Sequence, residues 1–341
     1  MRKKFDEIFE DCTKLGTKIR TDEYHPNGKH PIIDQGQEMV AGFTDLEDGL
    51  FDAVPAIVFG DHTRIIKYVD YPFFLGADGV KVLRSKVPDA NYRYLYYALE
   101  NARIPNTGYN RHYKWLKELE IEYPPISQQI KTVKVLDEVE SIIHNRQNQL
   151  QKLDELVKAR FVELFGDPVA NEKGWHVELL KDVCNGIGDG LHGTPEYDEV
   201  GAYPFINGNN LTNGTIEITP STRMVNTETY INHYIEISDN AILLSINGTL
   251  GKLALYNREK VMLGKSACYC NLRPEINREF VYGVMRTNAF AEFLERNATA
   301  STIKNVGLKA IRNFRLIVPP DDLQTEFVTF SRRVDKSKVV A

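Results

Sequence analysis

The sequence predicts an α+β protein in which two similar mixed α/β domains are separated by a long helix, with a second, shorter helix at the C-terminus. Three observations support this prediction. A chain of 341 residues divides by default into two domains of ordinary size. A set of local patterns occurs twice in the same order, and a sustained heptad pattern lies between the two copies. We expect two domains at residues 1–125 and 167–320, a spacer helix at 126–166 and a truncated helix at 321–341.

The repeat is visible as four matching segments in each half. Each half also carries a glutamine four residues after its second closing proline, Gln129 and Gln324. Four matches in one order indicate duplication, although unrelated α+β domains that share turn signals remain the alternative. The period-two segments with Gly, Asn and Asp turns predict strands joined by short helices. The matching segments are 28–34 (GKHPIID) and 201–207 (GAYPFIN), 56–61 (AIVFGD) and 241–248 (AILLSING), 94–99 (YLYYAL) and 280–285 (FVYGVM), and 119–125 (LEIEYPP) and 314–320 (FRLIVPP).

Between the halves, apolar residues recur at alternating spacings of three and four, interrupted by Arg146 and Arg160. This period is typical of a long helix that packs along another helix, a coiled coil. The alternative is an amphipathic helix that lies on a globular core. A similar pattern begins after Pro320 but has barely 20 residues before the chain ends. The apolar seam consists of Leu136, Val139, Ile143, Leu150, Leu153, Val157 and Leu164.

Patterns that would indicate catalysis or metal binding are incomplete. Lys265 and Ser266 resemble the end of a phosphate-binding loop, but Glu259 stands where its first glycine is needed. The four cysteines contain no C-x-x-C pair, and no histidine pair lies four residues apart beside a carboxylate. We therefore expect no catalytic centre, metal or cofactor in this chain. The cysteine usage and the lack of an apolar run of about 18 residues predict a cytoplasmic location.

Local basic charge points to nucleic acid despite the net charge of −5. Residues 101–117 and 296–320 occupy matching places in the repeat and contain no acidic residue. Such windows are expected to bind phosphate, and the alternative is a solvated charged edge. The candidates in the windows are Arg103, Tyr109, Arg111, His112 and Lys114, and then Lys304, Lys309 and Arg312.

The loops that follow the apolar strands add candidates for contact with base edges. Arg64 and Lys67 come after the first such strand, and Thr249 and Lys252 come after the second. Arginine reads guanine with two hydrogen bonds, and asparagine reads adenine in the same way. Asn209 and Asn210 are candidates for the latter role, with turn formation as the alternative.

A further set of segments is 59–64 (FGDHTR), 75–81 (LGADGVK), 106–113 (NTGYNRHY), 153–167 (LDELVKARFVELFGD), 189–195 (DGLHGTP) and 203–206 (YPFI). With these segments the chain resembles the specificity subunit of type I restriction–modification systems over essentially its whole length. The segment that contains Asp189 also places His192 among the DNA-binding candidates. The second helical region of this family usually matches the first in length, whereas here it stops about half-way.

The resemblance implies two target-recognition domains, each reading half of a split site in double-stranded DNA. The helices would act as a spacer and as a docking surface for methyltransferase subunits, which recruit a restriction and translocation subunit. Methyl transfer with S-adenosylmethionine, and cleavage with ATP and magnesium, would then belong to these partners. A second copy of the chain is another possible partner. The competing functions are a coiled-coil scaffold with two protein-binding heads and, less consistent with the motifs, a nuclease or methyltransferase with a degenerate active site.

Overall fold

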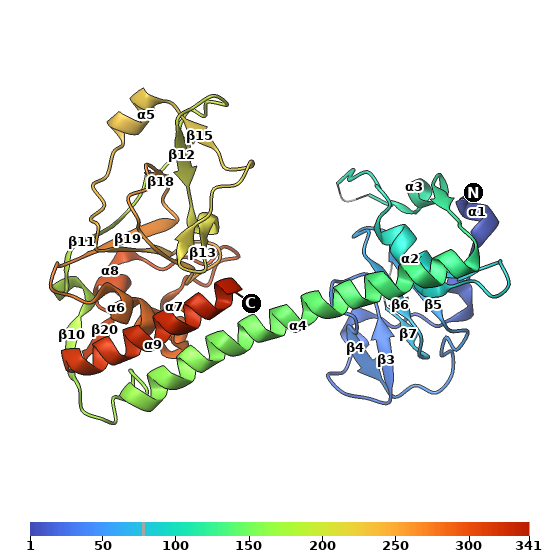
Figure 1. Cartoon of the computed structure of the whole chain (residues 1–341), viewed down its shortest axis with the longest axis horizontal. Helices are drawn as coiled ribbons and strands as arrows, with labels where there is room; N and C mark the ends of the chain where they lie inside the picture. The colour runs from blue at the N-terminus through green and yellow to red at the C-terminus, as the bar shows by residue number, and fades with distance from the viewer. Residues whose placement is uncertain (77–78, 109, 341) are drawn as a thin grey trace. The chain divides into compact units, whose positions relative to one another are not determined.

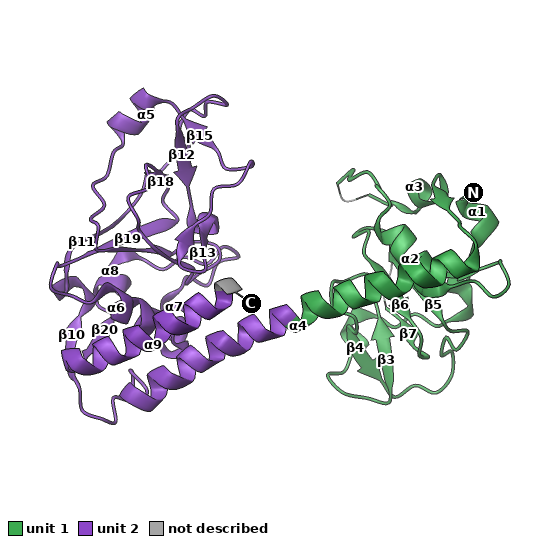
Figure 2. Cartoon of the chain, in the orientation of Figure 1, with its two compact units in different colours: residues 1–145 green, residues 146–341 purple. Residues whose placement is uncertain are grey.

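The computed structural model describes residues 1–76, 79–108 and 110–340. Contacts divide the chain into two compact units, residues 1–145 and 146–341 (Figure 2). The division falls inside one helix, α4 (Ile126–Phe165), so the first half of this helix belongs to the first unit and the second half to the second.

In its described residues, the first unit contains three sheets and three short α-helices besides its part of α4. Figure 1 labels several of them. The four-stranded antiparallel sheet has the order β2 (Phe9–Asp11), β8 (Val80–Ser85), β5 (Ala56–Gly60), β6 (Ile66–Val69). The three-stranded sheet is β4 (Gly42–Thr44), β3 (His30–Ile33), β7 (Phe74–Leu75), and β1 (Arg2–Lys4) pairs with β9 (Glu120–Glu122). The helices are α1 (Phe5–Ile8), α2 (Tyr92–Glu100) and α3 (Tyr113–Lys117).

The second unit contains the same three sheets in the same order. The four-stranded sheet has the order β11 (Cys184–Asp189), β19 (Ala267–Leu272), β16 (Ala241–Ser245), β17 (Leu253–Leu255). The three-stranded sheet is β15 (Met224–Val225), β12 (Tyr203–Ile206), β18 (Met262–Leu263). The two-stranded sheet pairs β10 (His176–Leu179) with β20 (Arg315–Val318). Helices α6 (Arg278–Met285), α8 (Leu308–Arg312) and α9 (Asp321–Val340) take the places of α2, α3 and the start of α4. The hairpin β13 (Leu211–Thr212) and β14 (Thr215–Ile216) and the helices α5 (Thr227–Asn232) and α7 (Asn288–Asn297) are additions.

Strand register confirms the repeat predicted from sequence. Ile32 of β3 lies opposite Phe74 in a parallel pair, and Phe205 of β12 lies opposite Met262 in the same way. Each of these strands also pairs antiparallel with its other neighbour. The predicted fold class, two similar α/β domains with a long helix between them, is therefore correct.

The two glutamines of the repeat have one structural role. Gln129 and Gln324 are buried, and the Nε2 of each donates a hydrogen bond of 2.8 Å to the carbonyl of Pro124 or Pro319. Both carbonyls lie where the last strand of a unit leads into a helix. Because a buried carbonyl without a partner is costly, each glutamine stabilises this strand-to-helix connection.

The second half of α4 packs antiparallel to α9 inside the second unit (Figure 1). Phe327 contacts both Phe161 and Phe165, with ring centroids 5.4 Å and 5.8 Å apart. Lys338, near the end of α9, donates a hydrogen bond of 2.8 Å to Asp154, which is earlier in α4. Contact partners therefore run in opposite directions along the two helices. Burial raises the pKa of Asp154, but the bonds from Lys338 and Arg286 outweigh it and leave that pKa below its usual value.

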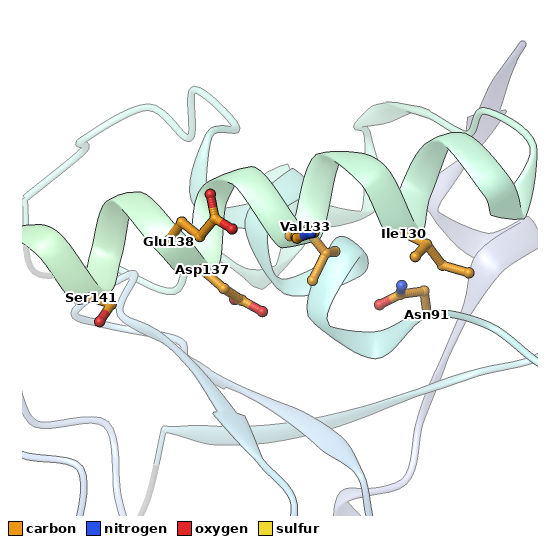
Figure 3. A pocket seen from close by; sticks show the side chains of 7 residues that line it. Asn91, Ile130, Val133, Asp137, Glu138 and Ser141 are labelled. Atoms are coloured by element: carbon orange, nitrogen blue, oxygen red, sulfur yellow. The ribbon is translucent and has the colours of Figure 1, made fainter.

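The first half of α4 packs on α2 instead. Arg93 of α2 forms ion pairs of 2.6 Å with Asp137 and 3.1 Å with Glu140. Figure 3 shows Asp137 and its neighbour Val133 on this part of α4, where they line a shallow pocket beside Asn91, the cap of α2. The second unit has the equivalent contact with reversed charge, since Glu279 of α6 pairs with Arg332 of α9.

The predicted seam is therefore covered over only part of its length. Val157 is buried, and Leu153 and Leu164 pack against the same core. Leu136 is half-buried, whereas Val139, Ile143 and Leu150 are 45%, 52% and 37% exposed. Both interpretations of the heptad pattern thus apply, because the helix packs on a head in its first half and pairs with another helix in its second.

We expect Phe327→Ala to destabilise the second unit by about 3–5 kcal/mol, because it removes the ring that joins α9 to α4. Trp175 contacts Phe165 and reports on this unit, so urea unfolding followed by its fluorescence in a Trp115→Phe background measures the loss. Leu150→Ala is the control, with an expected loss below about 1 kcal/mol at a partly exposed position. Equal losses in the two variants would contradict the role of the aromatic cluster.

Candidate nucleic-acid interface

Three loops of the first unit are bonded to one another. The hairpin turn after β5 contacts the loop after β3, because the amide of His62 donates to Oε1 of Gln35 at 3.2 Å and Oγ1 of Thr63 donates to its carbonyl at 2.6 Å. The same turn contacts the first acid-free window, because Nη1 of Arg64 donates to the carbonyl of Ile104 at 3.2 Å. The predicted basic window and the predicted strand-end loop therefore form one surface.

Asp61 fixes the end of that window. Its carbonyl accepts the backbone N–H of His112 at 2.8 Å and the ring Nδ1–H at 3.0 Å. Its carboxylate accepts the amide of Tyr113, the first residue of α3, at 2.7 Å. Three bonds to one buried residue hold the window against the strand end.

The second unit repeats this arrangement with different residues. The amide of Val306 donates to the carbonyl of Ile246 at 2.9 Å, which is the counterpart of the bond from His112 to Asp61. The amide of Gly248 donates to the carbonyl of Lys304 at 2.9 Å. The side-chain amide of Asn247 donates to Oδ1 of Asn305 at 3.2 Å. The central bond joins backbone atoms in both units, so this one contact is kept although the side chains around it differ.

The candidates of the first unit differ in accessibility. Arg103, Arg111 and Lys114 are exposed, and the ammonium of Lys114 lies 4.8 Å from the ring centre of Trp115. Arg64 is half-buried and has a positive φ of 64°, as the tight turn after β5 requires. Tyr109 lies outside the described residues, as do Ala77 and Asp78 of the segment 75–81.

Two candidates of the first unit are not where the sequence placed them. Lys67 is in strand β6 rather than on a loop, and it is only 5% exposed. His112 is fully buried with its ring bonded to Asp61, and its counterpart Val306 is equally buried. Neither side chain is available to solvent, because both pack beneath the loops.

In the second unit, His192, Asn209, Thr249 and Lys309 are exposed. His192 bonds to Asp189 at 2.8 Å. Lys304 pairs with Glu295 at 2.5 Å, so an acid from outside the window offsets part of its charge.

Three other candidates of this unit have internal hydrogen bonds. Arg312 donates to the carbonyl of Ile187 at 2.7 Å. Asn210 uses its amide to close a turn, with Nδ2 donating to Glu217 and Oδ1 accepting from Asn207, as its turn-forming alternative predicted. Lys252 is half-buried, and its backbone bonds to Ser245.

A family model described as "Type I restriction modification DNA specificity domain" matches residues 1–154 and 172–339. The chain belongs to this family. The two matched segments are the two repeats of the fold, so the resemblance inferred from sequence is confirmed. Among the described residues, no helix is long and apolar enough to cross a membrane.

Individual relatives agree with this assignment. A 94-residue segment is 29% identical to the type I restriction enzyme EcoR124I/EcoR124II specificity subunit of Escherichia coli, and covers 27% of this chain and 23% of that protein. The crystal structure of a type I restriction–modification S subunit from M. genitalium superposes with a TM-score of 0.54 at 18% identity, over 99% of this chain and 90% of that one. A structure from a study of type I R-M complex assembly and conformational transition gives a TM-score of 0.50 at 14% identity, over 100% and 91%. At these identities the structural matches show a shared fold.

The sequence patterns did not identify the residues whose side chains hold these loops together. Gln35, Thr63 and Asp61 of the first unit were not selected, nor were Asn247 and Asn305 of the second. Their positions in the repeat could have identified two of these residues, because Gln35 directly follows segment 28–34 and Asn247 lies inside segment 241–248.

We expect Asp61→Ala to loosen the first basic window, since it leaves the amide of Tyr113 without its acceptor at a cost of about 1–3 kcal/mol. Limited trypsin digestion should then cut faster after Arg103 and Arg111, as mass spectrometry can measure. Asp61→Asn retains an acceptor oxygen and should digest at the native rate. Unchanged digestion of the alanine variant would show that the carboxylate does not order the window.

Proposed function

We propose that this chain is the DNA sequence-specificity subunit of a type I restriction–modification complex, in which each unit reads one half of a split duplex site. The observation that carries the proposal is the duplicated loop cluster, built at equivalent strand ends of two repeats and edged by acid-free basic windows. Two reading surfaces on one chain suit a site with two specific halves.

The exposed side chains have the chemistry that such surfaces need. Arg103 and Arg111 can bond guanine or phosphate, and Asn209 can bond adenine. Lys309 and Lys114 supply positive charge for phosphate contacts, which dominate affinity and make it depend on salt. The proposed DNA surface therefore combines readout and positioning groups in both units.

The proposed docking face for methyltransferase subunits consists of exposed apolar residues in the first half of α4, namely Val135, Val139 and Ile143. In the repeat, Val135 and Val139 occupy the places of Phe330 and Val334 of α9. Phe330 and Val334 pack into the core beside the second half of α4, whereas Val135 and Val139 are 58% and 45% exposed. A helix of a partner subunit would cover this face.

The partners would also supply the chemistry. In the proposed complex, methyltransferase subunits use S-adenosylmethionine, and a restriction and translocation subunit uses ATP and magnesium. This chain would contribute the choice of sequence and the binding surface for these subunits.

Replacing Arg103, Arg111 and Lys114 together by glutamine should weaken binding to all duplex sequences. Each lost phosphate contact should lower the slope of log affinity against log salt by about 0.9. Fluorescence anisotropy over a salt series measures both effects. Lys29→Gln is the control, because this exposed lysine pairs with Glu47 just before β3 begins, whereas the loop cluster follows the end of that strand. Binding and slope that match the native chain would contradict the proposed phosphate face and favour a protein-binding scaffold.

Substituting Val139 and Ile143 by aspartate should prevent the methyltransferase subunit from binding, because charge on an apolar face opposes helix docking. Co-purification of the two subunits tests this, with DNA binding by the isolated variant as the measure of intact heads. Val162→Asp is the matched control, since Val162 is an exposed residue of the same helix outside the proposed face. Co-purification of the double variant at the native ratio would place the docking face elsewhere.

A further inference from the structure

A buried lysine lies beneath one of the three loops of the first unit. Lys67 points from β6 toward residues 34–41, the loop after β3, and its Nζ donates to the carbonyl of Glu38 at 2.5 Å. The same Nζ lies 3.5 Å from Oδ1 of Asp34, the first residue of the loop. The ammonium thus binds the loop at its start and near its middle.

Asp34 and Gln35 connect this anchor to the rest of the surface. Oδ1 of Asp34 accepts the amide of Gly36 at 2.7 Å and so forms a tight turn at the start of the loop. Gln35 bonds to His62 and Thr63 of the neighbouring hairpin turn. The residues that follow, Gln37 to Met39, are exposed. The buried ammonium of Lys67 therefore holds a loop whose residues 37–39 are exposed to solvent.

The second unit lacks this anchor at the equivalent positions. Lys67 lies opposite Val58 in the sheet, and Ala254 lies opposite the corresponding Leu243. Asn207 replaces Asp34 in the repeat. Asp34 packs against Gly76 and Asn207 packs against Gly264, so closely that a Cβ atom on either glycine would lie within 2.4 Å of its neighbour. Asn207 accepts a bond of 2.9 Å from the hydroxyl of Ser266 instead of facing an ammonium. The pair of a buried lysine and a partly buried aspartate is therefore a feature of the first unit that the shared fold does not require.

We propose that Lys67 is a positioning residue for sequence readout by the first unit, which fixes loop 34–41 in the conformation that meets base edges. This inference rests on the proposed DNA-binding function and assigns loop 34–41 to the reading surface. Lys67 itself does not touch DNA, because its ammonium is enclosed by the protein.

The physical argument concerns preorganisation. A free loop of this size would lose conformational freedom on binding, and that loss subtracts from affinity for every sequence. A loop that is already fixed loses less conformational freedom on binding. DNA with a wrong base is then rejected, because the fixed loop cannot move to form other hydrogen bonds with that base. Burial lowers the pKa of the Lys67 ammonium, while the Asp34 carboxylate opposes that shift. The geometry carries the argument, because one Nζ donates to the carbonyl of Glu38 and lies beside the carboxylate of Asp34, and so holds the loop at two points.

The test uses the full chain and selection from a random duplex library, followed by affinity measurements on the selected site and on single-base variants of it. Lys67→Met keeps the length of the side chain and removes its charge. The double variant Lys67→Ala with Asp34→Asn installs the pair found in the second unit and leaves no charge buried alone, so it remains informative if the methionine variant folds poorly. Lys86→Met is the matched control, because Lys86 of the same unit also donates to a backbone carbonyl, that of Asp6, but is exposed.

Both Lys67 variants should reject wrong bases in one half-site about tenfold less well than the native chain, while discrimination in the other half-site is retained. The slope of affinity against salt should stay native, because no phosphate contact is lost. The Lys86 variant should match the native chain in both measurements. Native discrimination in both half-sites, an equal loss in both, or a reduced salt slope with native discrimination would overturn the inference. If the native chain itself selects no sequence, the proposed function fails, which is a separate outcome.

Discussion

The antiparallel packing of α9 on the second half of α4 is the interaction on which the architecture depends. Phe161, Phe165 and Phe327 form one aromatic cluster that also contacts Phe280 of α6, so both helices and the head share a core. The second half of α4 precedes the second head in sequence but belongs to its core. A helix of 40 residues is thereby fixed at one end by packing that propensity alone would not supply.

The loop surfaces rest on a scaffold of backbone bonds. The bond from His112 to Asp61 and the bond from Val306 to Ile246 occupy the same place, although one pair is polar and the other apolar. Since the backbone supplies the geometry, side chains on either side of these bonds can differ between the units. The same framework can therefore present arginines in one unit and an asparagine in the other, which is what the proposed reading of two different half-sites requires.

The sequence was sufficient for the repeat, the long helix and the short final helix, because each is marked by a period or by turn residues at fixed positions. The sequence did not show which individual side chains are buried and which are exposed. Lys67 and His112 are polar residues in segments that also contain accessible basic residues, and only the register Val58–Lys67 and the bond to Asp61 reveal that they point inward. The heptad pattern likewise showed an apolar seam but not which half of it has a partner, because both halves have the same period.

Local charge explains how a chain with a net charge of −5 can carry two acid-free basic windows. Acids of the helices pair with nearby arginines, since Asp137 and Glu140 of α4 bind Arg93 and Glu279 of α6 binds Arg332. Partly exposed pairs of this kind add little stability, about 0–1 kcal/mol each. The windows at 101–117 and 296–320 contain no acid of their own, so acids elsewhere offset their charge only where they contact it, as Glu295 does at Lys304. Electrostatic attraction falls off over about 8–10 Å at physiological salt, so local charge on the loops governs an approaching phosphate more than the total does.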